Sequence, residues 1–112
     1  MTIALAPSGP VTRVAYLGTP ALAVPPLEAL VAAGIKVALV VSQPDRRRGR
    51  GSGLQPSPVK QAALDLGLPV TDIVADVVDA GVQLGVVVAF GRLIRLPVLE
   101  AVPMVNLHFS LL

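Results

Sequence analysis

The 112-residue sequence contains no cysteine and only one histidine. The first absence excludes a disulfide framework, thiol catalysis and cysteine-ligated metal sites, and the second excludes a histidine-rich metal site. We therefore expect no bound metal. A chain without cysteine also fits a reducing compartment, and we predict a cytoplasmic location.

Long hydrophobic runs are lacking as well. The longest, residues 37–41 and 86–90, are far shorter than the roughly 18 residues needed to span a membrane. Residues 1–10 contain two prolines and no basic residue, so we interpret them as a flexible N-terminal tail and not as a signal peptide. Residues 11–112 are then long enough for one small domain with a buried core.

Positive charge is low overall, at a net +2, but it is concentrated between Gln43 and Lys60. Five basic residues face one acidic residue there, which gives a local charge of +4 and leaves −2 for the rest of the chain. Residues 43–55 also contain Pro44 and three glycines, so we expect neither helix nor strand. Such a segment is most often a solvated loop, but arginines on a loose loop also suit bidentate contacts with phosphate.

The order of apolar segments predicts an open α/β sheet. A strand over residues 11–17, a helix over 21–33 and a strand over 35–42 form a βαβ unit, whose crossover is right-handed. We expect Thr19 to cap this helix and Gly34 to end it. Its predicted buried face consists of Leu22, Pro26, Ala29, Leu30 and Ala33.

The second half of the chain continues the alternation. Ser57 and Pro58 are typical of a helix N-terminus, with an apolar face formed by Val59, Ala62, Ala63 and Leu66. Residues 68–71 are a short strand, and residues 73–84 are ambiguous because their valines and Gly81 weaken a helix. The very apolar residues 85–90 predict a central strand, followed by a helical turn over 97–101 and a final strand from residue 105.

The final strand places Asn106, His108 and Ser110 on one face, because side chains alternate along a strand. The amide and the imidazole begin about 7 Å apart, close enough to hold and polarise one carbonyl oxygen. A lone histidine is more often a structural residue, so both interpretations stand at this point.

The stretch from Asn106 to Leu112 resembles the N-x-H-x-S-L-L signature of the folate-dependent formyltransferases. The resemblance implies that Asn106 and His108 act on the formyl group. It also implies an open, mostly parallel, Rossmann-like sheet with helices on both faces, truncated after the strand that carries these two residues.

Three further motifs resemble the methionyl-tRNA branch of this family: Q-P-D-R from Gln43, G-R-G from Gly49 and P-S-P-V-K from Pro56. That branch transfers a formyl group from 10-formyltetrahydrofolate to the amine of initiator methionyl-tRNA. The resemblance implies that tRNA contacts Arg46, Arg47, Arg48 and Arg50. Because the turn at Gly18 is not a G-x-G-x-x-G motif, we expect no nucleotide cofactor, and we predict no obligate protein partner.

Residues 86–91 resemble the V-V-V-A-Y-G segment of the family, with phenylalanine in place of tyrosine. In the family the following loop seats the pterin ring. The resemblance therefore implies a folate-binding group formed by Phe90, Gly91, Arg92, Leu93, Ser110, Leu111 and Leu112. Arg95 and Leu96 differ from the usual amino-acid sequence of this loop in the family.

The family carries a catalytic aspartate and a C-terminal tRNA-binding domain beyond the position of Leu112. We therefore expect residues 11–112 to be the N-terminal part of a formyltransferase domain that is inactive alone. Two alternatives stand: a non-catalytic RNA-binding or interaction module that kept the arginine-rich segment, and a formyltransferase that acts on a different amine.

Overall fold

A single six-stranded sheet organises the computed structural model, which describes residues 2–3, 9–47 and 53–108. The spatial order of the strands is β1-β6-β5-β2-β3-β4. Strands β2 to β6 pair in parallel, and β1 pairs antiparallel with β6. The strands are β1 (Thr2–Ile3), β2 (Arg13–Gly18), β3 (Lys36–Val41), β4 (Val70–Thr71), β5 (Leu84–Val88) and β6 (Met104–Leu107).

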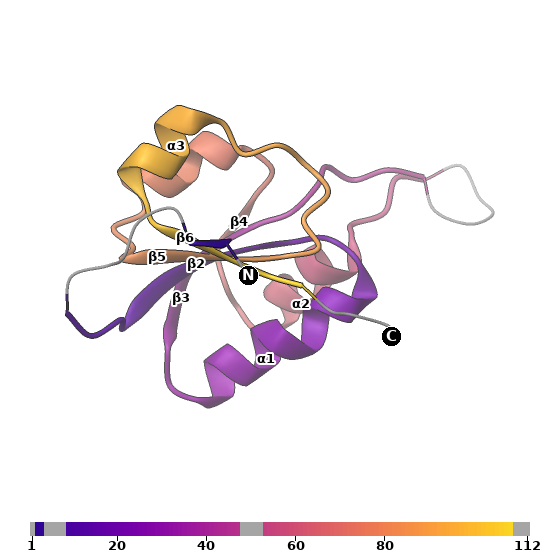
Figure 1. Cartoon of the computed structure of the whole chain (residues 1–112). Helices are drawn as coiled ribbons and strands as arrows, with labels where there is room; N and C mark the ends of the chain where they lie inside the picture. The colour runs from indigo at the N-terminus through magenta and orange to yellow at the C-terminus, as the bar shows by residue number, and fades with distance from the viewer. Residues whose placement is uncertain (1, 4–8, 48–52, 109–112) are drawn as a thin grey trace.

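Helical segments cover both faces of this sheet (Figure 1). One face carries α1 (Val24–Ala32) and α2 (Pro58–Asp65), and the other carries the 3-10 segment η2 (Val74–Asp79) and α3 (Leu96–Ala101). The predicted Rossmann-like architecture is therefore confirmed, and so is the central place of β5. None of the helices in the described ranges combines the length and hydrophobicity needed to cross a membrane.

The core consists of two apolar clusters, one on each face of the sheet, because successive side chains of β2 and β5 point to opposite faces. The cluster under α1 and α2 is built around Tyr16, Leu27, Val59 and Val88. The cluster under η2 and α3 is built around Leu17, Val77, Phe90 and Met104.

The helix predicted over residues 21–33 begins with a 3-10 turn, η1 (Ala21–Ala23), and its predicted buried face is wrong at Leu22, Ala29 and Ala33, whereas Leu30 packs against the core. Ala23 and Leu27 are fully buried, whereas Leu22 is 54% exposed. A 3-10 turn has 3.0 residues per turn, and this shifts the phase of every later position relative to an α-helix. Since almost every residue of this segment is apolar, the sequence offered no contrast to reveal the shift.

Two predicted helix ends have different outcomes. Thr19 does not cap the helix; its hydroxyl instead donates to the backbone oxygen of Phe90 at 2.8 Å. Ser57 caps α2 as predicted, because its side chain accepts from the backbone N–H of Lys60 at 3.0 Å. Leu66, predicted on the buried face, is 39% exposed because α2 has already ended there.

The ambiguous residues 73–84 contain η2, in which Val77 is buried against the sheet. At the other end of the chain, the interpretation of residues 1–10 as a tail without regular structure is wrong at Thr2–Ile3. These residues pair with β6, with Thr2 opposite Asn106 and Ile3 opposite Val105. Strand pairing uses backbone groups, so the hydrophobic pattern did not predict it.

Candidate active site

Four strand ends meet at one edge of the sheet, because β2, β3, β5 and β6 run in the same direction. Thr19, Gln43, Ala89 and His108 follow these strands directly or after one residue. In open α/β sheets this edge is where ligands bind. The candidate site is therefore built from loops that the parallel sheet brings together.

The predicted catalytic pair lines one cavity at this edge. This Asn106 cavity has a volume of about 360 Å³. Its lining consists of Leu22, Ala89, Phe90, Gly91, Asn106, Leu107 and His108.

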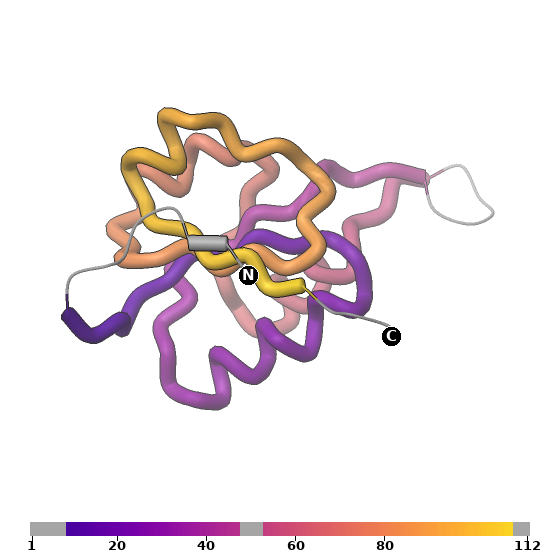
Figure 2. The backbone as a smooth tube through the Cα atoms, in the orientation of Figure 1, coloured from indigo at the N-terminus to yellow at the C-terminus, as the bar shows by residue number. Residues whose placement is uncertain are grey.

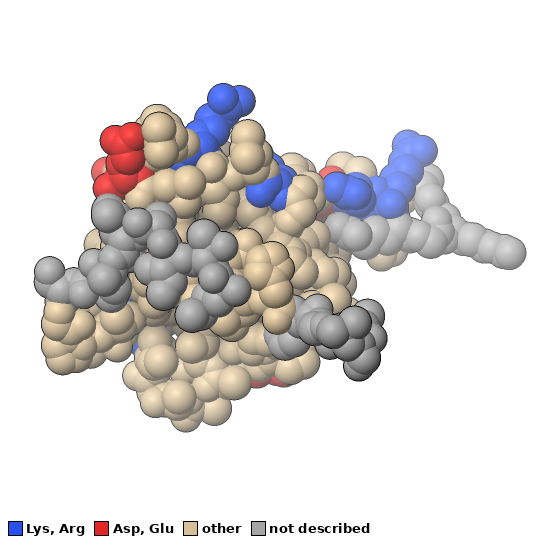
Figure 3. Space-filling view, in the orientation of Figure 1, with Lys and Arg blue, Asp and Glu red and all other residues tan. Residues whose placement is uncertain are grey.

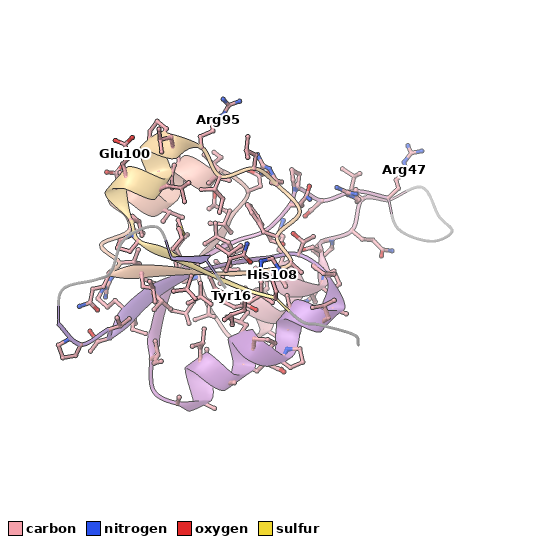
Figure 4. All side chains as sticks on the ribbon, viewed as in Figure 1. Tyr16, Arg47, Arg95, Glu100 and His108 are labelled. Carbon is pink, nitrogen blue, oxygen red and sulfur yellow. The ribbon has the colours of Figure 1, made fainter. Side chains whose placement is uncertain are left out.

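Within this cavity Asn106 is half-buried and His108 is exposed. Figure 4 shows His108 at the open end of β6. Between them, Leu107 packs against the apolar cluster under α1 and α2. The alternation predicted for this strand thus separates an apolar side chain from two polar ones, and the exposure of His108 excludes a histidine packed in the core.

The wall of the Asn106 cavity opposite β6 has an unusual backbone. Ala89 has φ +48° and Gly91 has φ +79°, which lie in the left-handed region that residues other than glycine rarely adopt. Between them the side chain of Phe90 is 3% exposed and belongs to the core. The ring of Phe90 is thus a core group, and the two left-handed residues around it turn the backbone along the cavity.

The next two residues of the predicted folate group face elsewhere. Arg92 and Leu93 line a second cavity of about 450 Å³ between η2 and α3. Arg92 donates from Nη1 to the backbone oxygen of Asp72 at 2.7 Å, and its guanidinium lies 6.0 Å from the ring centroid of Phe90. The structure thus brings Phe90 and Gly91 to the same cavity as Asn106 and His108, and directs Arg92 and Leu93 to a neighbouring cavity. Ser110, Leu111 and Leu112 lie outside the described residues.

The arginine segment comprises residues 43–55, and its described parts, residues 43–47 and 53–55, extend from the body of the molecule (Figure 2). Arg46 and Gln55 exchange two backbone hydrogen bonds, of 3.1 and 2.9 Å, which close the base of the segment. Arg47 points away from the body (Figure 4), and basic side chains line this extension (Figure 3). Arg48 and Arg50 lie outside the described residues.

Several polar residues of the motifs have structural roles that sequence reasoning missed. Lys60 forms a salt bridge of 2.8 Å with Asp45, and the hydroxyls of Ser42 and Ser57 share a buried hydrogen bond. Gln43 reaches the backbone oxygen atoms of Phe90 and Gly91. A polar motif that begins where a buried strand ends indicates that such residues have a structural role. It does not indicate which residues they bond.

No group of three or more histidine, cysteine, aspartate or glutamate side chains is placed to hold a metal ion within residues 2–3, 9–47 and 53–108.

A family model described as "Formyl transferase" matches residues 12–112, nearly the whole chain. The chain belongs to the formyl transferase family. The family predicted from the sequence motifs is therefore confirmed.

Relatives within the formyl transferase family are similar along most of this chain. A methionyl-tRNA formyltransferase of Heliobacterium modesticaldum is 55% identical over 109 residues, which cover 89% of this chain and 34% of the relative. Proteins of the same name from Moorella thermoacetica and Elusimicrobium minutum are 48% and 45% identical, over 89% and 87% of this chain and 35% and 31% of their own lengths. The chain thus spans about a third of the length of these curated relatives.

Proposed function

We propose that this chain provides the donor cavity and the RNA-facing segment of an enzyme that transfers a formyl group from 10-formyltetrahydrofolate to the amine of initiator methionyl-tRNA. The observation that carries the proposal is the placement of Asn106 and His108 on one cavity at the carboxyl edge of the sheet. The similarity to methionyl-tRNA formyltransferases supports the choice of substrate.

The chemistry requires hydrogen-bond donors at the formyl oxygen. When the amine attacks the formyl carbon, a C–N bond forms and the oxygen becomes negatively charged. Collapse of this intermediate breaks the bond to N10 of the folate, and the proton lost by the amine balances the one gained by N10. The amide N–H of Asn106 and a ring N–H of His108 are donors suited to the developing charge.

The acceptor side of the proposal rests on charge. Arg46 and Arg47 are exposed on the arginine segment, with Arg48 and Arg50 following in the sequence. Guanidinium groups bind phosphate oxygens in a bidentate manner and position a nucleic acid without reading its sequence. In this proposal the arginine segment holds the tRNA while the amine enters the Asn106 cavity.

We also propose that the reaction takes place in the cytoplasm, with the folate as formyl donor and with neither a metal nor a nucleotide cofactor. Translation supplies the tRNA substrate, and the formyl group arrives already activated on the folate. No membrane and no obligate protein partner take part.

Binding measurements on the 112-residue protein test the two ligand sites separately. We expect it to bind tetrahydrofolate and an RNA hairpin that mimics the tRNA acceptor stem. Substituting Arg46 and Arg47 with alanine should weaken RNA binding and reduce the slope of its salt dependence, by roughly 0.7 to 0.9 for each phosphate that these side chains neutralise. RNA binding without folate binding would favour the non-catalytic RNA-binding module instead.

Formyl transfer itself is best tested in a chimera. Residues 12–112 of this chain would replace the matching segment of the Heliobacterium relative, to which the chain is 55% identical. We expect the chimera to formylate methionyl-tRNA and the 112-residue protein alone to do so far more slowly. A folded chimera that formylates a different amine but not methionyl-tRNA would contradict the substrate assignment.

A further inference from the structure

The side chain of Gln43 contacts both functional parts of the molecule. Its amide nitrogen donates to the backbone oxygen of Gly91 at 3.1 Å and lies 3.4 Å from that of Phe90, both on the wall of the Asn106 cavity. Its amide oxygen accepts from Nη2 of Arg46 at 3.2 Å, at the base of the arginine segment. One amide therefore joins two loops that follow different strands.

The cavity wall is shaped to receive this amide. A Cβ added to Gly91 would lie 2.8 Å from Nε2 of Gln43 and would displace this amide, and glycine also suits the φ of +79° at this position. The hydroxyl of Thr19 also donates to the backbone oxygen of Phe90, at 2.8 Å. Two side chains thus hold this wall, and Gln43 connects it to Arg46.

Arg46 can keep this contact while it binds a phosphate. A guanidinium group has five N–H donors, and its hydrogen bond to Gln43 uses Nη2. The backbone of Arg46 is fixed by its paired hydrogen bonds to Gln55. A phosphate that orders the Arg46 side chain would therefore also order the amide of Gln43.

We propose that Gln43 is a positioning residue that couples RNA binding to folate binding, an inference that rests on the function proposed above. RNA held by Arg46 immobilises the amide of Gln43, which in turn fixes the backbone of residues 90–91 around the donor. Ordering by the first ligand lowers the entropic cost of the second, so the two ligands bind with positive cooperativity. Thermodynamic linkage requires each ligand to increase the affinity for the other by the same factor.

The experiment compares tetrahydrofolate dissociation constants of the 112-residue protein with and without a saturating acceptor-stem RNA hairpin. We expect RNA to tighten folate binding at least about fivefold. Gln43→Leu should reduce that factor to nearly one. Leucine is neutral, so the long-range attraction of the RNA is unchanged.

Gln61→Leu is the matched control, because Gln61 is exposed on α2 and bonds only Asp65 among the described side chains. It should retain the native factor. Gln43→Asn is a second test in case the leucine variant does not fold, since its shorter side chain cannot reach both loops. Cooperativity that persists in either Gln43 variant, or is absent from the native protein, overturns the inference. A native protein that fails to bind one ligand would instead overturn the proposed function.

Discussion

At the scale of single residues, the candidate site depends on two donors that lie two positions apart on β6. Parallel pairing with β5 places Asn106 beside Val87 and Leu107 beside Val88, so the end of β6 stays in register with the strand that leads to the cavity wall. Donors fixed in this way stabilise a developing charge without reorganising when it appears. Their effect is therefore expected on the rate of transfer and not on the affinity for substrates.

Removing either donor gives the first residue-scale prediction. In the chimera, Asn106→Ala and His108→Ala should each lower kcat by roughly 10² to 10³, the usual loss for one donor to an oxyanion. Steady-state kinetics with folate and methionyl-tRNA should show KM changed far less than kcat. Leu22→Ala, an apolar change in the same cavity, is the control and should retain kcat within a few fold. A change confined to KM in the Asn106 and His108 variants would contradict this role.

The placement of Asn106 and His108 on one face of β6 could be predicted, because side chains alternate along a strand with a period of two residues. The role of Gln43 could not, because its partners, Phe90 and Gly91, lie 47 and 48 positions away along the chain. Phe90 has a buried ring and also lines the Asn106 cavity, so its role toward folate, implied by the resemblance, stays a prediction.

At the scale of elements, α2 anchors the return of the arginine segment to the body. Ser57 has two roles there, as the cap of α2 and as the buried hydrogen-bond partner of Ser42. Ser57→Ala should lower the free energy of unfolding by about 1 kcal/mol for the missing cap and by about 1 kcal/mol for the missing hydroxyl pair. Ser42→Ala removes only the second contribution.

Urea unfolding of both variants separates the two roles. The decrease in unfolding free energy for Ser57→Ala should exceed that for Ser42→Ala by about 1 kcal/mol. Glu28→Ala, a change at an exposed position of α1, is the control and should remain within about 0.5 kcal/mol of the native protein. Equal decreases in the two serine variants would show that the cap contributes nothing.

The two helices under the sheet show why some elements were easier to predict than others. The start of α2 is marked by Ser57 and Pro58, so its phase and its buried residues Val59 and Ala63 followed from the sequence. The segment that contains α1 is apolar on nearly every side, and the 3-10 turn that sets its phase has no marker. Helix phase is predictable where capping chemistry fixes it.

At the scale of the whole molecule, Tyr16 makes stability depend on pH. It is the only tyrosine, is fully buried, and donates its hydroxyl proton to the backbone oxygen of Ala23. Burial raises the pKa of Tyr16 far above its ordinary value of 10. The folded state therefore keeps a proton that the unfolded state loses above about pH 10.

The contribution of Tyr16 is thus complete below about pH 10 and falls as the pH rises above it, by up to about 1.4 kcal/mol per pH unit. Urea unfolding at increasing pH should show this fall in the native protein relative to Tyr16→Phe, which cannot ionise. The variant should also be less stable by about 1 to 3 kcal/mol at neutral pH, because the oxygen of Ala23 loses its donor. Parallel pH curves for the two proteins would contradict the burial of this hydroxyl. Tyrosinate absorbance reports the same residue directly.

The alternation of strands and helices was sufficient to predict the three-layer architecture, because each buried strand needs a covering helix. The pairing of β1 with β6 was beyond such reasoning, since it uses backbone groups of Thr2 and Ile3.

That pairing has a practical result for anyone who handles this protein. Thr2 pairs with Asn106, so an affinity tag fused to the N-terminus, or trimming by an aminopeptidase, would alter the immediate neighbour of a proposed catalytic residue. Purification tags fused to the N-terminus should be removed before enzymatic turnover is measured.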